Sequence, residues 1–392
     1  MSRTRPERSR KVCMLVTGDC TRDGRTLKEA KALTRRGLQV VVLAVKEPNT
    51  ARLEQRNGIR IRRADVLLRR LPKWPLLLPA KLGEFALRTL AAGVAERADV
   101  YHAHALEPMV IAWAAARLVG ARLVFDSREL TLDRMGYHGL PGPVRRLIAG
   151  YERAMARRAD AVLDVTPERA ALLSERCGIP TPPVVGNYPE VRSPETTCLL
   201  RETLGLPEDT KIALYQGLFR PDRGLAELVE AMERVPEGLL VLMGFGAYRS
   251  ELERMVQSRG LSERVRFAAA APPTETVRHA ASADVGLVTL KNTCLNNYYA
   301  APSKLYDYLM AGLPVIVSDF PGLRAIAEQG AGIAVDPESP EEIAEALNRI
   351  LSDDALRRAM ARRARELAET EYNWERASRV LLEVYDGLLA GR

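Results

Sequence analysis

Residues 301–319 read APSKLYDYLMAGLPVIVSD, and this stretch decides the fold prediction because it joins a short helix directly to a buried strand. Pro302 and Ser303 suit the first turn of a helix, where a serine caps free amides. Gly312 followed by Pro314 ends the helix after roughly nine residues. The apolar run PVIVS then resumes a sheet. We therefore expect the helix to begin at the carboxyl ends of parallel strands, where its free N–H groups and its dipole stabilise a phosphate.

Charged side chains follow this helix start. Lys304 adds a full positive charge beside the expected phosphate site, and Asp307 lies one turn further, where its carboxylate can accept hydrogen bonds from ribose hydroxyls. The alternative is purely structural, with Ser303 as a cap, Lys304 in solvent and Asp307 as an acid that offsets the helix dipole.

Short apolar runs alternate with helical patterns along the whole chain, which is typical of β-α-β repetition. Runs that are apolar on both faces belong in parallel sheets covered by helices. A length of 392 residues suits two domains, and the strand signals lapse near residues 189–208. We predict an α/β protein with two doubly wound, Rossmann-like domains that face a central cleft. The domains span 11–190 and 206–371, and a C-terminal helix over 372–392 packs back on the first.

Several of these stretches together resemble one large enzyme family. SKLYDYLMAGLPVIVSD, with GIAVDPESPEEIAEAL after it, is similar to the donor-nucleotide motif of retaining glycosyltransferases with the GT-B architecture, the group 1 or family 4-like sugar transferases. The segments RDGRTLKEAKALTRRGLQVVVLA, ADVYHAH and LYQGLFRPDRGLAELVEAM resemble further parts of the same family. The resemblance implies the GT-B fold, with an acceptor-binding first domain and a donor-binding second domain.

The same resemblance implies a hexosyl- or glycosyltransferase. Such an enzyme moves a sugar from a nucleotide-diphosphate sugar to a hydroxyl acceptor, which is a glycan, a lipid-linked saccharide or a small molecule, with retention of anomeric configuration. Neither a metal nor another cofactor is expected, because no D-x-D motif lies at a plausible site. Lysine and arginine can neutralise the leaving diphosphate in place of a cation.

The resemblance also nominates site residues, each with a plainer alternative. Arg223, at the end of QGLFRPDR, is expected to bind the diphosphate together with Lys304, although a solvated loop arginine fits the sequence as well. His104 shares one face of a strand with His102, and it is placed to contact the transferring sugar unless it is an ordinary core histidine. Glu129 is expected on the acceptor side, to bind acceptor or to position His104. The donor-binding candidates are Gly18, Gly24, Arg25, Gly217, Arg220, Gly244, Gly246, Tyr299, Ser303 and Asp307.

Three positions depart from the family pattern. Tyr299 stands where a glutamate is common, Leu218 where an arginine is common, and Arg128 where a histidine is common. A tyrosine hydroxyl must then replace a sugar contact, or that contact is lost. Arg220 or Arg223 must carry the phosphate charge in place of the missing arginine.

Three other activities compete with sugar transfer. A nucleotide-sugar epimerase can share the two-domain architecture, but it needs acid and base carboxylates flanking the sugar, which Asp307 alone does not provide. A non-catalytic partner protein that binds a sugar nucleotide is compatible with the departures at Tyr299 and Leu218. An NAD-dependent dehydrogenase is disfavoured, because no dinucleotide fingerprint follows any strand.

Charge and composition bear on partners and location. The net charge of +8 favours an acidic partner, and with 5% aromatic residues nucleic acid is the least supported. Residues 66–79, VLLRRLPKWPLLLP, mix leucine, tryptophan and basic residues in a way that suits an anionic membrane surface, or a loop packed on its own domain. Five scattered cysteines and the lack of an apparent signal peptide predict a cytoplasmic protein, peripheral on the inner face of the membrane if that surface is used. The sequence leaves the sugar, the base and the acceptor open.

Overall fold

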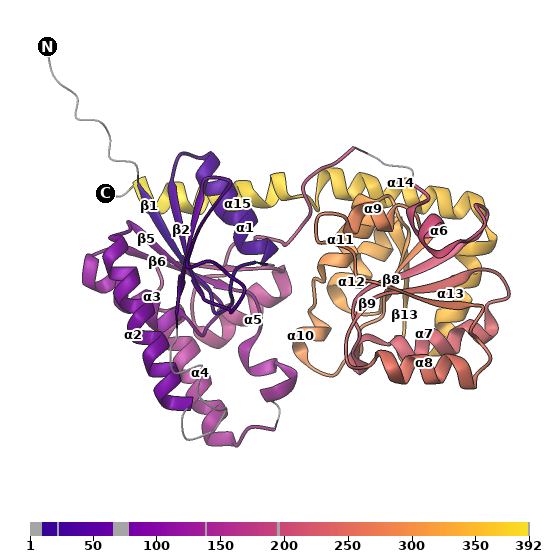
Figure 1. Cartoon of the computed structure of the whole chain (residues 1–392), viewed down its shortest axis with the longest axis horizontal. Helices are drawn as coiled ribbons and strands as arrows, with labels where there is room; N and C mark the ends of the chain where they lie inside the picture. The colour runs from indigo at the N-terminus through magenta and orange to yellow at the C-terminus, as the bar shows by residue number, and fades with distance from the viewer. Residues whose placement is uncertain (1–9, 22, 66–77, 138, 194–196, 391–392) are drawn as a thin grey trace, which may run out of the picture. The chain divides into compact units, whose positions relative to one another are not determined.

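The computed structural model describes residues 10–390 except 22, 66–77, 138 and 194–196. The chain divides into two compact units (Figure 1). The first unit comprises Met1–Val185 with Ser378–Arg392, and the second comprises Gly186–Ala377. Most of the stretch that suggested a membrane surface, residues 66–79, lies outside the described residues.

The first unit is built on a seven-stranded sheet in the order β3-β4-β2-β1-β5-β6-β7. All neighbouring strands are parallel except β3 and β4, which pair antiparallel at one edge. The central strands are almost entirely buried because helices cover both faces of the sheet. The strands are β1 (Lys11–Leu15), β2 (Gln39–Val45), β3 (Leu53–Arg56), β4 (Ile59–Ala64), β5 (Val100–His104), β6 (Arg122–Ser127) and β7 (Ala161–Asp164).

Helices lie on both faces of this sheet. Figure 1 shows α2 and α3 on one side and α1 with α15 on the other. The alternation of side chains along β5 follows this arrangement, since the Tyr101 hydroxyl donates to the Gly93 carbonyl of α2 while His102 contacts Tyr385 of α15. The helices of this unit are α1 (Gly24–Arg35), α2 (Leu78–Glu96), α3 (Met109–Val119), α4 (Gly142–Ala156), α5 (Pro167–Cys177) and the Ser378–Ala390 part of α15 (Trp374–Ala390).

The second unit is built on a six-stranded, wholly parallel sheet in the order β10-β9-β8-β11-β12-β13. The strands are β8 (Ile212–Leu218), β9 (Leu239–Phe245), β10 (Val265–Ala268), β11 (Val285–Val288), β12 (Val315–Ser318) and β13 (Gly332–Val335). The helices are α6 (Leu199–Leu204), α7 (Leu225–Ala231), α8 (Arg249–Ser258), α9 (Thr276–Ala280), α10 (Leu295–Tyr298), α11 (Ser303–Met310), α12 (Pro321–Ile326), α13 (Pro340–Ser352) and α14 (Asp354–Thr370). Separate apolar clusters cover the two faces, one with α9, α11 and α14 and the other with α7, α8 and α13. The prediction of two doubly wound parallel sheets is therefore confirmed.

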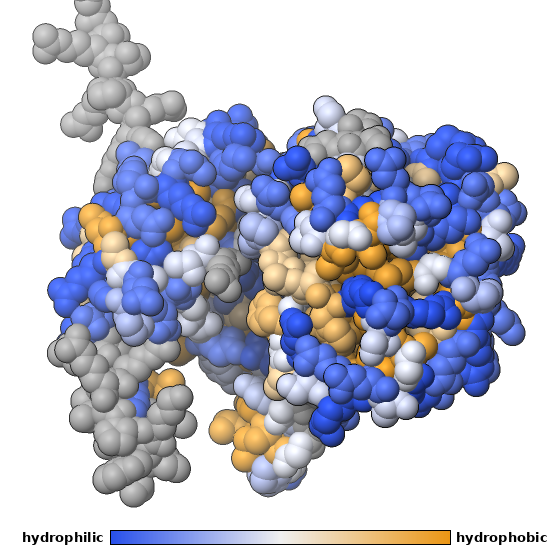
Figure 2. Space-filling view, turned by 45° about the vertical axis from the view of Figure 1, so that its right-hand side comes forward, coloured by the Kyte–Doolittle hydropathy of each residue, from blue (hydrophilic) through white to orange (hydrophobic). Residues whose placement is uncertain are grey.

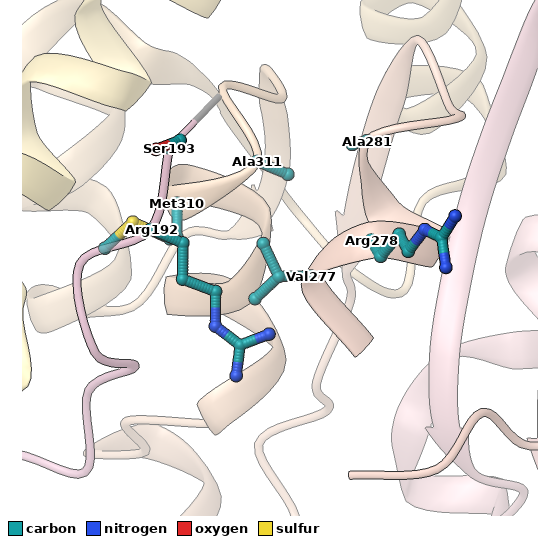
Figure 3. A pocket seen from close by; sticks show the side chains of 7 residues that line it. All are labelled: Arg192, Ser193, Val277, Arg278, Ala281, Met310 and Ala311. Carbon is teal, nitrogen blue, oxygen red and sulfur yellow. The ribbon is translucent and has the colours of Figure 1, made fainter. Parts of the chain in front are cut away.

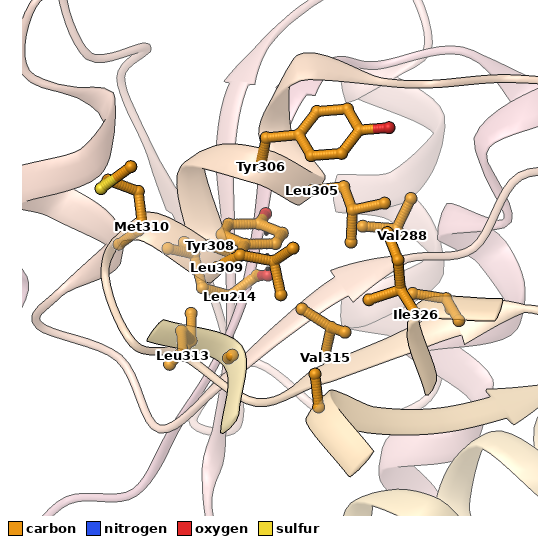
Figure 4. Packing of buried hydrophobic residues seen from close by; sticks show 14 of the residues in the cluster. Leu214, Val288, Leu305, Tyr306, Tyr308, Leu309, Met310, Leu313, Val315 and Ile326 are labelled. Carbon is orange, nitrogen blue, oxygen red and sulfur yellow. Dashed lines mark hydrogen bonds between the residues drawn. The ribbon is translucent and has the colours of Figure 1, made fainter. Parts of the chain in front are cut away.

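Helix α11 is fixed on the sheet by its apolar face. Figure 4 shows Leu305, Tyr308 and Leu309 of α11 among the side chains of the strands below. The Tyr308 hydroxyl accepts from the Gln216 amide at 2.9 Å and donates to the Leu214 carbonyl at 3.2 Å, so this buried phenol is satisfied on both counts. Packing and hydrogen bonds together hold the start of α11 beside the carboxyl end of β8.

The surface of the molecule is mostly polar on the face that Figure 2 presents, with smaller apolar areas between the charged side chains. Within the described residues, no helix is both long enough and apolar enough to cross a bilayer.

Candidate functional site

The start of α11 lacks a side-chain cap. Its N-cap residue is Pro302, which offers no capping atom, and Ser303 is the exposed first residue of the helix, so the expectation that Ser303 acts as a cap is wrong. The helix ends at Met310, and Gly312 follows it with φ +68°, as the sequence predicted. Uncapped amides and the positive end of the dipole leave this helix start available to an anion.

Lys304 lies beside the same helix start. Its Nζ atom is 3.5 Å from the centroid of the Tyr215 ring, a cation–π contact, and the side chain is half-buried. Burial lowers the pKa of Lys304 well below its ordinary value, and the nearby charge of Arg223 lowers it further. Burial therefore opposes the charged form of Lys304 in the free protein, and a bound anion would favour that form.

Gly217 makes room for this lysine. Its φ is +137°, and an added Cβ would lie 3.2 Å from Nζ and 3.4 Å from Cε of Lys304. Only glycine takes that backbone conformation without strain. The backbone at the end of β8 and the position of the Lys304 side chain therefore both depend on Gly217.

Arg220 and Arg223 lie in the short loop after β8. The buried Asp222 carboxylate accepts from Arg220 Nε at 3.0 Å and from Asn297 Nδ2 at 3.1 Å, which ties the loop to α10. Arg223 interacts electrostatically with Lys304, because its positive charge lowers the pKa of the lysine. The structure thus brings together Arg223, Lys304 and the start of α11, which is an arrangement suited to a diphosphate.

The two glycines after β9 serve the backbone. An added Cβ would lie 1.8 Å from the Gly217 carbonyl oxygen at Gly244, and 2.3 Å from the Phe219 carbonyl oxygen at Gly246. Their absent side chains therefore let the ends of β8 and β9 meet. Among the described residues, the nearest atoms to Gly244 and Gly246 belong to β8 and the loop after it, which gives these glycines a structural role.

The two motif positions, Tyr299 and Asp307, lie on either side of the start of α11. Tyr299 is the C-cap residue of α10, and its ring packs edge-on against Tyr298 with 4.9 Å between centroids. Asp307 lies in the second turn of α11 and is half-buried.

A small hollow lies at the opposite end of α11 from Lys304. Figure 3 shows that the guanidinium groups of Arg192 and Arg278 point in different directions around it, so they do not converge on one ligand position. The hollow is lined by Arg192, Ser193, Val277, Arg278, Ala281, Met310 and Ala311.

In the first unit, His104 ends β5 within a buried network of charges. Its Nδ1 atom lies 3.0 Å from Asp126 Oδ2 and 2.9 Å from Arg128 Nη2. Asp126 also receives two hydrogen bonds from Arg25, at 2.9 and 2.7 Å, and Arg25 donates a third to the Val185 carbonyl. Arg25 is therefore occupied inside the protein, and it supports the site by holding Asp126.

The members of this network have pKa values shifted in different directions. Burial opposes ionisation of Asp126, but the charge of Arg25 and the hydrogen bonds from His104 and Arg25 hold its pKa well below the ordinary range. Burial raises the pKa of Glu29 to about 8. Burial and the charge of Arg128 lower the pKa of His104 to about 4, so this imidazole is neutral at physiological pH.

Four buried side chains bring potential metal ligands within 4.8 Å of one another: Glu29, His102, His104 and Asp126. Asp126 Oδ2, however, already accepts from Arg25 Nε at 2.9 Å and from Arg128 Nε at 3.2 Å. A cation among these atoms would face two guanidinium charges at contact distance. The cluster is better suited to hold a proton than a metal ion.

The remaining candidates of the first unit lie around the carboxyl edge of its sheet. Gly18 is in the loop after β1, where its carbonyl accepts from the Val45 amide, and Gly24 is the first residue of α1. Glu129 is half-exposed and pairs with Arg134 at 2.9 Å, whereas Arg128 is the neighbour that contacts His104. Left-handed backbone at Ala105, directly after His104, has φ +75°, a strain that often accompanies functional loops.

Sequence inspection missed several members of these two groups. Asp222 and Asn297 are distant in sequence, and no motif marks them. Glu29 lies one helical turn after Arg25, and Tyr385 lies near the C-terminus. Only the i, i+4 spacing of Arg25 and Glu29 carried a readable signal, as a pair on one helix face.

Two models of known protein families together match most of the chain. A family model described as "Glycosyl transferases group 1" matches residues 199–367, and one described as "Glycosyl transferase 4-like domain" matches residues 25–187. The chain belongs to the group 1 glycosyltransferases. The predicted family, fold and enzyme class are confirmed, and the activity is transfer of a sugar from a nucleotide sugar to an acceptor.

Individual relatives of this glycosyltransferase cover nearly its whole length. A D-inositol 3-phosphate glycosyltransferase of Xylanimonas cellulosilytica is 29% identical over 92% of this chain and 89% of the relative. The structure of sucrose-phosphate synthase from Thermosynechococcus elongatus is similar with a TM-score of 0.84 at 22% identity, covering 98% of this chain and all of that one. HepE of Anabaena in complex with UDP is similar with a TM-score of 0.73 at 16% identity, covering 96% of this chain and all of that one. At these sequence identities the similarity to the two structures establishes the fold alone.

Proposed function

We propose that this glycosyltransferase binds its nucleotide-diphosphate sugar on the second unit, with the diphosphate at the start of α11. The observation that carries the proposal is the uncapped helix start flanked by the charges of Lys304 and Arg223. As the glycosidic bond breaks, negative charge develops on the diphosphate, and these groups stabilise it. Tyr299, Asp307 and Arg220 are proposed to contact the sugar, the ribose and the outer phosphate.

The proposed reaction retains the anomeric configuration and uses no metal ion. Arg223 and Lys304 can supply the positive charge that a divalent cation supplies elsewhere. We assign no carboxylate the role of a nucleophile, so same-face attack by the acceptor is the proposed route. Domain closure that excludes water would favour transfer over hydrolysis.

The acceptor is proposed to be a hydroxyl compound held by the first unit. The relatives include a D-inositol 3-phosphate glycosyltransferase and a lipopolysaccharide core biosynthesis glycosyltransferase, and inositols and saccharides carry hydroxyl groups. Glu129 is half-exposed at the carboxyl edge of the sheet and is our candidate for the acceptor. His104 is proposed to act on the sugar through Nε2, for which no hydrogen-bond partner exists among the described residues. Because the His104 side chain is fully buried, the atoms that cover Nε2 must move when substrate binds.

A cytoplasmic location on the inner membrane face is also proposed. Helix α4 exposes Val144 at 40% and Leu147 at 73%, next to the exposed Arg146. Apolar and basic side chains on one exposed helix suit anionic headgroups. The variants Arg146→Glu and Leu147→Asp should co-sediment less with phosphatidylglycerol vesicles than the wild type does. Binding equal to that of the wild type would exclude this helix as the membrane contact.

Saturation-transfer NMR against a panel of UDP- and GDP-sugars tests the donor proposal. One donor is expected to bind the wild type, and Lys304→Ala and Asp307→Ala are expected to lose it. Lys211→Ala is the control, because Lys211 lies at the other end of β8 and donates to the Leu351 carbonyl. Equal binding by Lys304→Ala and wild type would place the diphosphate elsewhere. Release of nucleoside diphosphate on adding acceptors then reports turnover.

A further inference from the structure

Two histidines of β5 form a stacked pair that is held from both sides. The rings of His102 and His104 lie 4.3 Å apart with 20° between their planes, because residues two apart on a strand share a face. Each Nδ1 atom has a partner, Tyr385 Oη at 2.9 Å for His102 and Asp126 Oδ2 at 3.0 Å for His104. Neither Nε2 atom has a hydrogen-bond partner in the part of the chain that the structure describes.

Tyr385 reaches His102 from α15, far along the chain. Its side chain is fully buried, and its ring centroid lies 6.1 Å from that of His102. The helix is docked on the first unit by other contacts, since Arg36 pairs with Asp386 at 2.9 Å and Arg10 donates to the Leu389 carbonyl. The hydroxyl is therefore presented to His102 by a helix whose position does not depend on that hydrogen bond.

The groups around the pair bear on the tautomer of each ring. His104 Nδ1 faces both the Asp126 carboxylate, an acceptor at 3.0 Å, and Arg128 Nη2, a donor at 2.9 Å, so its neighbours do not select one tautomer. For His102, the Tyr385 hydroxyl donates to Nδ1, and the proton on Nε2 then faces Glu29 Oε2 at 3.8 Å. The tautomer of His102 is thus assigned from its hydrogen-bond network.

The other groups that face the pair are charged. Arg128 directly follows β6, Arg25 lies in α1, and Asp23 is the N-cap residue of α1. Arg128 acts on both rings, Arg25 on His102 and Asp23 on His104. Burial with the charge of the neighbouring His104 lowers the pKa of His102 well below its ordinary value. Glu29 Oε2 lies 3.8 Å from His102 Nε2, and because burial raises the pKa of Glu29 to about 8, the charge beside the pair changes near physiological pH.

We propose that Tyr385 is a positioning residue for sugar transfer: its hydroxyl fixes the ring of His102, and the stack of His102 on His104 fixes the direction of the His104 Nε2 atom. The inference rests on the function proposed above for His104. Without the hydroxyl, Nδ1 of His102 is buried and unpaired, so that ring changes tautomer or turns. The ring of His102, against which His104 stacks, then changes orientation. A misdirected Nε2 atom of His104 slows the chemical step more than it weakens donor binding.

Selective ¹⁵N-histidine labelling gives a readout that is independent of activity. The chain has four histidines, so the ring nitrogens are few enough to assign by substitution. In Tyr385→Phe the His102 nitrogen shifts are expected to move toward the other tautomer, and the His104 Nε2 shift is expected to move with them. Tyr101→Phe is the matched control, because it also removes a buried phenol hydrogen bond of β5, to the Gly93 carbonyl at 2.7 Å, without touching the pair.

Kinetics complete the test. Tyr385→Phe is expected to lower kcat about tenfold with the KM for donor changed less than about twofold, while Tyr101→Phe keeps the wild-type values. Unchanged histidine shifts in Tyr385→Phe, or wild-type kcat in that variant, would overturn the inference. Shifted histidines in a protein that transfers no sugar from any donor would instead overturn the proposed function and leave the Tyr385 contact standing.

A second variant covers the case in which Tyr385→Phe does not fold. Glu29→Gln removes the carboxylate whose Oε2 lies 3.8 Å from His102 Nε2 and 4.0 Å from His104 Nδ1, and it leaves Tyr385 in place. The same coupled movement of the His102 and His104 shifts is expected. Movement of the His102 signals alone would show that the stack does not transmit orientation.

Discussion

Replacing Lys304 by methionine is expected to stabilise the folded protein and, at the same time, to weaken its binding of a nucleoside diphosphate. The two effects have one cause, which is the burial of an ammonium beside Arg223. Methionine keeps the length and the apolar stem of lysine but removes the charge.

The loss of binding can be sized from the contact that the charge makes. A hydrogen bond between charged groups contributes about 1.5–3 kcal/mol, and each 1.4 kcal/mol corresponds to about tenfold in affinity. The dissociation constant for the nucleoside diphosphate should therefore rise by about 10- to 100-fold, with the helix dipole and Arg223 left to hold the rest.

The change in stability has a definite pH dependence. Because the pKa of Lys304 is lower in the folded protein than the ordinary 10.5, the unfolded chain binds more protons between those two values. The lysine therefore destabilises the fold fully at pH below its folded pKa, and this effect disappears as the pH rises to 10.5. The cation–π contact with Tyr215 offsets part of it.

Titration calorimetry with UDP and GDP, and thermal unfolding from pH 6 to pH 10, measure both effects. Lys211→Met is the control, since that lysine lies away from α11. Unchanged affinity in Lys304→Met would refute the diphosphate site. A lower melting temperature at every pH would refute the claim that burial of the ammonium is costly.

Three further substitutions test the geometry. Gly217→Ala places a Cβ 3.2 Å from Lys304 Nζ at φ +137°, so it should cost about 1–3 kcal/mol of stability and weaken donor binding. Gly205→Ala, at φ +63° with open space around it, is the control and should affect stability alone. Calorimetry measures donor binding in both variants, and urea unfolding measures their stability. Asp126→Asn leaves Arg25 short of its buried partner and is expected to lower the free energy of unfolding by about 3–5 kcal/mol in urea titrations, and a loss below about 1 kcal/mol would contradict the buried network. Glu29 has a folded pKa raised to about 8 from 4.5, so wild-type stability should fall as the pH rises through that interval, and Glu29→Gln should flatten the profile; parallel profiles for the two proteins would rule out the raised pKa.

The fold was predictable because its signals are local and repeated. Each parallel strand is a short apolar run, and each helix that follows has its own start and end residues. The helix over Ser303–Met310 is an example, since Gly312 and Pro314 mark its end in the sequence. What failed was the detail of its first turn, where Ser303 follows the N-cap position and Pro302 occupies it. Local propensities do not fix a boundary to one residue.

The donor side of the site was predictable in part. Lys304 and Arg223 share a motif or a loop that begins at a strand end, and parallel sheets gather such ends on one edge. The roles of Gly244 and Gly246 were not readable, because the atoms that their side chains would strike belong to the neighbouring strand. A sequence shows a glycine but not the backbone beside it.

The network around His104 was largely hidden in the sequence. Arg25 looked like a ligand-binding residue, but its guanidinium is bound to Asp126, a residue about a hundred positions away. Tyr385 joins the same network from α15. Contacts between such distant residues follow from packing, and no local pattern encodes them.

A crystal structure of the protein with bound UDP or GDP, whichever binds more tightly, tests the central claim most directly. The account predicts diphosphate oxygens on the backbone amides at the start of α11 and within hydrogen-bond distance of Lys304 Nζ and the Arg223 guanidinium. Diphosphate bound elsewhere, with Lys304 still against Tyr215 and the first turn of α11 unoccupied, would contradict it.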